Sequence, residues 1–279
     1  MGGLEVSILS RPTIALLTDF GHRDHYVGVM KGVIARIAPD ARVIARCHEI
    51  PPQDVDAAAF MLMTSMRYLP DDTIFVCVVD PGVGSARDAI GVRCGRRVLI
   101  GPDNGLFTLA VGQHAALDAV VLDNPRYHLL PVSHTFHGRD IFSPTAAHLA
   151  AGVPFEELGS EKSLDALAML DELTPQLEGK ELQGRVIHMD HFGNLITNLS
   201  KEACELLHGK APGLKIELPE AQLALEVLET FSDVPIGDAV AYAGSSGMLE
   251  IAIRQGSARE KLGIKKGARV VASPSYPRT

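Results

Sequence analysis

The sequence predicts an α/β N-terminal domain with a mainly parallel sheet, followed by a smaller all-β, barrel-like C-terminal domain. In the first half, short runs rich in β-branched residues alternate with longer segments whose apolar residues recur at helical spacing. From about residue 184 onward, short strands follow one another with turns between them. The 279 residues are enough for two modest domains, and we expect these at 1–178 and 179–279.

The first half contains five expected strands, each a short apolar run bounded by turn residues. They are "TIALLTD" (13–19), "RVIARC" (42–47), "DTIFVCVVD" (72–80), "RRVLIG" (96–101) and "AVVLD" (119–123). Helices are expected between them, over a segment that ends at Pro39 and over one that begins at Asp54 or Asp56 and ends at Pro70. A further helix begins near Pro144. Strands that alternate with helices are typical of a parallel sheet covered on both faces.

The second half contains strands with little helix. The expected strands lie in "GRVIHMDHFGNLITNL", "LKIEL", "ALEVLETF", "AVAYAG", "MLEIAI" and "ARVVASP", and one helix lies in "SKEACELLHG". Between the two halves, the segment from about residue 156 to 184 is acidic and has few core residues. We expect it to be a linker and assign most of it to the N-terminal domain.

Composition and charge exclude several classes of protein. The 34 acidic and 26 basic residues give a net charge of -8, which disfavours the broad positive surface of a nucleic-acid-binding protein. The cysteines form no CxxC pair, so neither a disulfide framework nor a zinc knuckle is indicated. No signal-peptide pattern begins the chain, and its longest apolar run falls well short of the ~20 residues of a membrane helix. We therefore expect a cytoplasmic protein that binds neither nucleic acid nor membrane.

Acidic residues follow three of the expected strands. Asp19 ends the first strand, Asp80 ends the third, and Asp103 follows the fourth. Each alone is typical of a turn. Because ligands of open α/β sheets bind beyond the carboxyl ends of the strands, three such acids together predict a polar pocket. An ionised Asp19 is suited to accept hydrogen bonds from two ribose hydroxyls.

Two loops carry candidate catalytic residues. "VVDPGVGSAR" combines the residues of a tight turn with Asp80 at one end and Arg87 at the other, which a turn alone does not require. "SHTFHGRDIF" places His137 beside a glycine, which permits the close approach of a small reactant. Alone, such a histidine is more often structural, but together with Asp80 and Arg87 we interpret His137 as a candidate catalytic residue.

The segment "TDFGHRDHYVG" offers a metal-binding alternative. It gathers Asp19, His22, Asp24 and His25, but their spacing matches no standard ligand motif. We expect no metal and no cofactor. A metal-dependent hydrolysis through Asp19, His22 and His25 remains an alternative hypothesis.

The C-terminal half contributes candidate substrate-binding residues. In "DHFGN", Phe192 can stack on a planar base, and the Asn194 amide can read its hydrogen-bonding edge. The same residues are also typical of β-turns. The full candidate set of this half is Asp190, Phe192, Asn194, Ser245, Ser246 and Glu250.

Six segments, taken in order, resemble one enzyme family. They are "LLTDFGHRDHYVGVMKG", "VVDPGVGSAR", "IGPDNGLF", "TFHGRDIFSPTAAHLAAG", "DHFGNLITNL" and "YAGSSGMLEIAI". Together they resemble the S-adenosyl-L-methionine hydroxide adenosyltransferases, relatives of the fluorinating and chlorinating enzymes that attack the same sulfonium substrate. The resemblance implies an α/β N-domain and a β-barrel C-domain. It also implies a homotrimer, with substrate bound between the N-domain of one subunit and the C-domain of its neighbour.

The resemblance implies an activity and a role for each candidate. The activity is hydrolysis of S-adenosyl-L-methionine to adenosine and L-methionine, by attack of an activated water or hydroxide at C5′ of the ribose. Asp80, Arg87 and His137 match the family's Asp-Arg-His set, which positions and activates that water, and Asp19 matches its ribose-binding acid.

In the C-terminal half, the resemblance covers the remaining parts of the substrate. Phe192 and Asn194 match the family's adenine contacts. Asp190, Ser245 and Ser246 lie where its members hold the methionine portion.

Two departures from the halogenating relatives disfavour halide chemistry. Those enzymes carry a serine where Gly138 stands here, and the sequence leaves no room for the loop inserted in the fluorinating branch. The Asp80 carboxylate would also repel an incoming halide. A halide adenosyltransferase and a non-catalytic protein that binds S-adenosyl-L-methionine or adenosine are the alternative functions.

Overall fold

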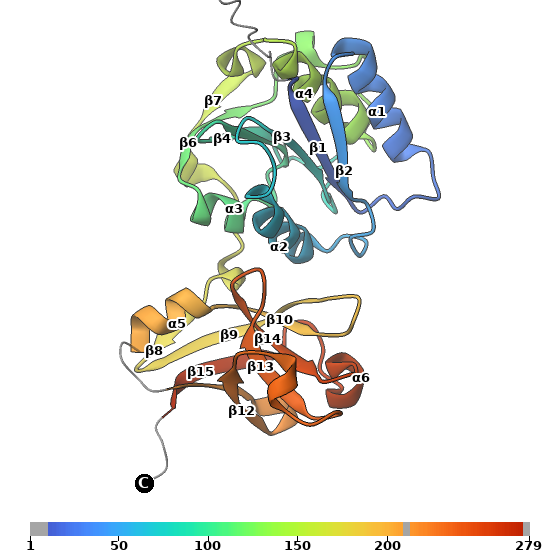
Figure 1. Ribbon diagram of the computed structural model, residues 1–279. Coiled ribbons are helices and arrows are strands. Elements are labelled where there is room, and N and C mark those ends of the chain that lie inside the picture. The colour runs from blue at the N-terminus through green and yellow to red at the C-terminus, as the bar shows by residue number, and fades with distance from the viewer. Residues whose placement is uncertain (1–10, 209–212, 276–279) are drawn as a thin grey trace, which may run out of the picture. The chain divides into compact units, whose positions relative to one another are not determined.

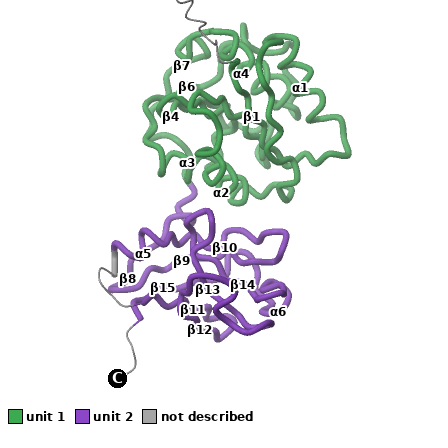
Figure 2. The backbone as a smooth tube through the Cα atoms, in the orientation of Figure 1, with its two compact units in different colours: residues 1–169 green, residues 170–279 purple. Residues whose placement is uncertain are grey.

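The computed structural model describes residues 11–208 and 213–275. Most of the segment 1–12, in which the sequence shows no signal-peptide pattern, lies outside these described residues. The chain divides into two compact units, Met1–Met169 and Leu170–Thr279 (Figure 2). This division falls inside the acidic segment between the two halves.

Within the described residues, the first unit is built on one seven-stranded sheet with the order β2-β1-β3-β5-β4-β6-β7 (Figure 1). The strands are β1 (Thr13–Thr18), β2 (Arg42–Cys47), β3 (Ile74–Val78), β4 (Ala89–Cys94), β5 (Arg97–Pro102), β6 (Ala116–Val121) and β7 (Ser160–Lys162). The pairs β1–β2, β1–β3 and β3–β5 are parallel. Because β4 is antiparallel to both β5 and β6, β6 points the same way as β5, and the predicted mainly parallel sheet is confirmed.

Helices cover both faces of this sheet. They are α1 (Tyr26–Ile37), α2 (Val55–Met66), α3 (Thr108–Gln113) and α4 (Ser143–Ala150). Alternate residues of β1 face opposite sides, so Leu16 packs in one apolar cluster with α1 and α4, while Leu17 packs in the other with α2 and α3. Asp54 begins α2, because its carboxylate accepts a hydrogen bond from the Ala57 N–H at 3.0 Å.

The second unit is a closed β-barrel, as the sequence predicts. In the described residues, β10 pairs with both β14 and β9, which closes a ring of seven strands, and β8 adds to β9 outside the ring. The elements are β8 (Gln176–Glu178), β9 (Glu181–Met189), β10 (Leu195–Ser200), α5 (Lys201–His208), β11 (Gly213–Leu218), β12 (Leu223–Leu228), β13 (Ala239–Ala243), β14 (Met248–Ile253), α6 (Ala258–Leu262) and β15 (Arg269–Ser275). In residues 11–208 and 213–275, every helix is too short or too polar to span a membrane.

Strand register brings the first two candidate acids to one edge of the sheet. In the parallel pair β1–β3, Thr18 lies opposite Val78. The chain therefore leaves both strands at the same edge, and Asp19 and Asp80 follow within two residues of the strand ends. A ligand site is therefore expected at the carboxyl edge of the sheet.

We expect a fragment of residues 170–279 to fold on its own, because the closed barrel encloses its own apolar cluster. Cooperative urea unfolding, followed by circular dichroism, measures this. A matched fragment that begins at residue 184 lacks β8 and the buried Leu182, and it should unfold at a lower urea concentration. A 170–279 fragment without a cooperative transition would contradict the division.

Candidate active site

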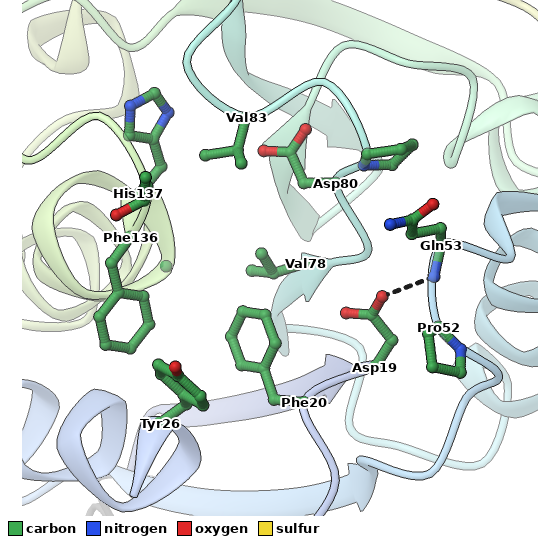
Figure 3. A pocket seen from close by; sticks show the side chains of 13 residues that line it. Asp19, Phe20, Tyr26, Pro52, Gln53, Val78, Asp80, Val83, Phe136 and His137 are labelled. Atoms are coloured by element: carbon green, nitrogen blue, oxygen red, sulfur yellow. Dashed lines mark hydrogen bonds between the residues drawn. The ribbon is translucent and has the colours of Figure 1, made fainter. Parts of the chain in front are cut away.

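A cavity of about 390 Å³ opens at the carboxyl edge of the first sheet (Figure 3). Its volume lies in the range of small-molecule sites. It is lined by Asp19, Phe20, Tyr26, Pro52, Gln53, Val78, Asp80, Pro81, Val83, Thr135, Phe136, His137 and Gly138. Residues from four separate segments of the chain thus meet here, and three of the predicted site residues are among them.

Asp80 and Arg87 form a bidentate ion pair beside this cavity. The Arg87 Nε donates to one carboxylate oxygen of Asp80 at 3.0 Å, and Nη2 donates to the other. Only 5% of the Asp80 side chain and 10% of the Arg87 side chain are exposed. Two parallel hydrogen bonds fix the plane of the guanidinium relative to the carboxylate, so neither side chain turns freely.

Arg87 also reaches His137. Its Nη2 lies 2.7 Å from Nδ1 of the imidazole. A guanidinium can only donate hydrogen bonds, so Nδ1 must accept, which places the proton of the neutral ring on Nε2. Burial lowers the pKa of His137, and the Arg87 cation lowers it further, so the ring is neutral at pH 7. The structure therefore brings the predicted Asp80, Arg87 and His137 within mutual reach.

A glycine allows the two loops of this cluster to pack together. Gly84 has a φ of +79°, and a Cβ there would stand 2.7 Å from the His134 carbonyl oxygen. The loop that carries Asp80 and Arg87 thus touches the backbone just before His137. Any larger residue at position 84 would push the two loops apart.

Asp19 lies on another side of the cavity. One of its carboxylate oxygens accepts a hydrogen bond from the Gln53 N–H at 2.8 Å. Figure 3 shows the other oxygen on the side of Phe20 and Val78. Asp19 is therefore held in place and still has accepting capacity toward the cavity.

Three aromatic rings form a wall that the sequence analysis did not predict. The ring centroids of Phe20, Tyr26 and Phe136 lie 5.2 to 5.9 Å apart. A Cβ added to Gly138 would meet Phe136 at 3.3 Å and Met30 at 3.2 Å, so this wall packs directly on the glycine backbone. The sequence does contain an indication of two of these rings, because Phe20 directly follows the candidate Asp19 and Phe136 directly precedes the candidate His137.

The residues of the metal alternative do not converge. The ring of His22 packs edge-on against His48 at 5.3 Å, and His25 stacks on Tyr26 at 4.7 Å. In the described ranges, 11–208 and 213–275, no group of three or more His, Cys, Asp and Glu side chains is placed to hold a metal ion.

Asp103 is not among the residues that line the cavity, so the prediction that it is the third acid of the pocket is wrong. Its carboxylate lies 3.0 Å from Lys162 Nζ instead. The cause is β4, which pairs antiparallel with β5 and supplies a neighbouring backbone: the Asp103 N–H donates to the Asp88 carbonyl at 3.0 Å. Periodicity gave no sign of β4, so the sequence analysis missed this contact.

The barrel carries a second hollow, of about 580 Å³. It is lined by Phe192, Asn194, Thr230, Phe231, Ser232, Ile253, Arg254, Gln255 and Gly256. Phe192 is 75% exposed, whereas Asn194 is buried. Asp190 accepts hydrogen bonds from the backbone N–H groups of both residues and from the Asn194 side-chain amide, so it organises this turn.

The other candidates of the barrel are not among the residues that line this hollow. Ser245 and Ser246 stand in the turn between β13 and β14, where the Ser246 hydroxyl accepts a hydrogen bond from the Met248 N–H at 3.3 Å. Glu250 accepts a hydrogen bond from the Tyr242 hydroxyl at 2.7 Å, and burial raises its pKa. Their part in binding remains a prediction.

These features define a two-domain protein with an Asp-Arg-His cluster on an α/β unit and a second hollow on a β-barrel. The family model described as the S-adenosyl-L-methionine hydroxide adenosyltransferase N-terminal domain matches residues 14–159. The model for the C-terminal domain of the same family matches residues 184–271. The chain belongs to this family.

Individual relatives match over nearly the whole chain. An (R)-S-adenosyl-L-methionine hydrolase of Thermus thermophilus is 44% identical over 263 residues, which are 91% of this chain and 96% of the relative. A fluorinase of Nocardia brasiliensis is 30% identical over 288 residues, covering 93% of this chain and 96% of that enzyme. The crystal structure of an uncharacterized conserved protein from Thermotoga maritima superposes with a TM-score of 0.84 at 33% identity, covering 93% and 99% of the two chains.

We expect Gly84→Ala to lower the free energy of unfolding by about 1–3 kcal/mol, because the positive φ and the His134 carbonyl both oppose a Cβ. Denaturant unfolding measures the change. Gly82→Ala is the matched control in the same loop: a Cβ there meets its nearest neighbour at 3.4 Å, so we expect a change within about 0.5 kcal/mol. Equal effects of the two changes would show that the loops do not depend on this contact.

Proposed function

We propose that this protein hydrolyses S-adenosyl-L-methionine to adenosine and L-methionine by attack of water at C5′ of the ribose. The observation that carries the proposal is the hydrogen-bonded cluster of Asp80, Arg87 and His137 beside a cavity that also contains Asp19. The relatives named as hydrolases support it, since the one from Thermus thermophilus is 44% identical and the fluorinase of Nocardia brasiliensis 30%.

The chemistry needs a base and no acid. The oxygen of water forms a bond to C5′, the C5′–S bond breaks, and its electron pair stays on sulfur as a neutral thioether. The leaving group therefore requires no proton, whereas water is a poor nucleophile until it loses one. A positioned base contributes about a hundred- to ten-thousand-fold to such a step.

In this proposal Asp80 accepts the proton, and His137 holds the water. Both line the cavity, while Arg87 stands behind them. With Nδ1 occupied by Arg87, the neutral imidazole presents an N–H at Nε2, which donates a hydrogen bond to the water oxygen. The Asp80 carboxylate keeps lone pairs beyond the two that Arg87 engages, and one of these takes the proton.

Charge neutralisation speeds this step in a dry site. The developing hydroxide is negative and the sulfonium is positive, so charge disappears on the way to the transition state. Water stabilises the separated charges more than the transition state, and its exclusion lowers the barrier. The aromatic wall of Phe20, Tyr26 and Phe136 provides apolar surface for this purpose.

The rest of the substrate is assigned to the remaining candidates. Asp19 accepts hydrogen bonds from the ribose hydroxyls. Phe192 stacks on adenine, and Asn194 reads its edge, in the hollow of the barrel. The methionine portion binds near the turns of the barrel, at Asp190, Ser245, Ser246 and Glu250.

Hydrolysis is favoured over halide transfer by two features of the cavity. The Asp80 carboxylate repels an anion at the position of the nucleophile. A side chain at Gly138 would meet Met30 and Phe136 within 3.3 Å, so there is no space for a halide-holding serine unless both move.

We propose that the reaction needs no metal or other cofactor and takes place in the cytoplasm. The sulfonium is already an activated leaving group, and a side-chain base is enough to activate the water. The cysteines of the described part are all free, as is typical of a reducing compartment: Cys47, Cys77, Cys94 and Cys204.

We expect Asp80→Asn and His137→Ala each to lower turnover by about 10²–10⁴-fold, because the first removes the base and the second removes the hydrogen bond that holds the water. Chromatography of the products from S-adenosyl-L-methionine in halide-free buffer measures this, and calorimetry should show adenosine binding largely intact. Asp40→Asn, a change at an exposed carboxylate, is the control.

Three results would contradict this assignment. Variants with full activity would remove these residues from the chemistry. Intact substrate after prolonged incubation with the wild-type protein would favour a non-catalytic binding protein. A halogenated nucleoside that appears with chloride or fluoride would favour halide transfer.

We further propose that the protein is a homotrimer in which each active site combines the first unit of one subunit with the barrel of its neighbour. Mixing subunits tests this. Asp80→Asn and Asn194→Ala proteins, which should each have reduced activity alone, should recover activity after their subunits exchange, because some sites then join an intact first unit to an intact barrel. Sedimentation equilibrium should give a trimer mass. No recovery on verified exchange would place each site within one chain.

A further inference from the structure

Lys162, on the edge strand β7, lies between two carboxylates. Its Nζ is 2.8 Å from Asp88 and 3.0 Å from Asp103. The Lys162 side chain is 11% exposed and that of Asp103 9%, whereas that of Asp88 is 44% exposed. The Lys162–Asp103 pair is costly to break at this depth, because a removed partner leaves a buried charge behind. Asp103 is fixed on its other oxygen as well, which accepts the Ala168 N–H at 2.8 Å.

One backbone carbonyl, that of Asp88, connects these two aspartates to the candidate active site by hydrogen bonds. The Asp88 carbonyl accepts the Asp103 N–H at 3.0 Å, and it also accepts Arg87 Nη1 at 3.2 Å. Arg87 therefore has its Nε and Nη2 on the reacting cluster and its Nη1 on this carbonyl. The Asp88 carbonyl therefore holds the guanidinium through Nη1, the nitrogen that bonds neither Asp80 nor His137.

The positive charge of Lys162 stabilises the backbone hydrogen bond between Asp88 and Asp103. Without the ammonium group, two carboxylates that share one cation would repel each other. Their repulsion acts on the backbone link between Asp88 and Asp103, next to the paired residues Ala89 and Pro102 of β4 and β5. If that hydrogen bond breaks, the Asp88 carbonyl moves away from Arg87. The hydrogen bond with Asp88 also raises the pKa of Lys162, which keeps the ammonium charged.

We propose that Lys162 is a positioning residue for the hydrolysis: it holds Asp88 against Asp103, and the Asp88 carbonyl in turn orients Arg87 toward Asp80 and His137. The proposal rests on the proposed function for its kinetic consequence. Its structural consequence, the orientation of Arg87, is independent of any activity.

Proton NMR titration of His137 tests the orientation without substrate. Arg87 lowers the pKa of His137 in the intact protein. Lys162→Met should therefore raise the His137 pKa, as should Arg87→Met. The double variant should titrate like Arg87→Met alone, because the lysine acts through the arginine. Lys162→Arg keeps the positive charge and should leave the pKa of His137 at its wild-type value.

Steady-state kinetics with S-adenosyl-L-methionine test the consequence. We expect Lys162→Met to lower kcat roughly 10- to 100-fold, the effect of a misplaced catalytic group. KM should change little, because Lys162 lies outside the residues that line the cavity. Lys215→Met is the matched control: it breaks a lysine–carboxylate pair on β11 of the barrel and should leave both kcat and the His137 titration unchanged.

The outcomes separate the two proposals. An unchanged His137 titration in folded Lys162→Met protein overturns the positioning role, whatever the activity. A wild-type protein that forms no adenosine overturns the proposed function, while the titration still decides the positioning role. If Lys162→Met does not fold, Lys162→Gln also removes the ammonium charge and leaves Asp88 and Asp103 as unscreened like charges, so the same shift is expected from it; a normal titration there counts against the proposal.

Discussion

The bidentate pair between Asp80 and Arg87 is the constraint on which the rest of the site depends. Both side chains are almost fully buried, and buried charges are tolerated only when they are paired and hydrogen-bonded. The pair fixes the guanidinium, the guanidinium fixes the tautomer of His137, and the tautomer decides which group can take a proton. The glycine loop, the support at Asp88 and the backbone before His137 all serve to keep this pair in place.

The cluster also matches its proposed substrate electrostatically. Asp80 and Arg87 cancel in charge and His137 is neutral, so the cavity has no excess cation beside the sulfonium. A neutral imidazole is needed for this, since a charged ring would repel both Arg87 and the substrate. Burial and Arg87 together keep the ring neutral, so the arginine that orients the histidine also sets its protonation.

The sequence predicted what is local and missed what is long-range. Strands, the helix cap at Asp54 and the position of Asp19 and Asp80 at one cavity were accessible, because both acids follow apolar runs and ligands bind at such strand ends. Strand β4 was missed because "AIGVRC" follows a glycine-rich loop without clear periodicity. Asp103 was misassigned for the same reason, and Lys162 was missed because only pairing through β6 and β4 brings its segment near that acid. Such contacts have no signature along the chain.

The proposed division of labour between the two units follows from the shape of a nucleoside. In that proposal the first unit contributes the groups for the ribose and its reacting carbon, whereas the barrel contributes an exposed aromatic ring and an oriented amide. The base is attached to C1′ and C5′ to C4′ of one ribose ring, so the base and the reacting carbon can be held by two different surfaces. Joining those surfaces would also exclude water, and the neutralising transition state gains from exclusion. A site assembled from two surfaces can thus bind its substrate and exclude water from it in one step. An open sheet edge alone leaves the substrate exposed to water.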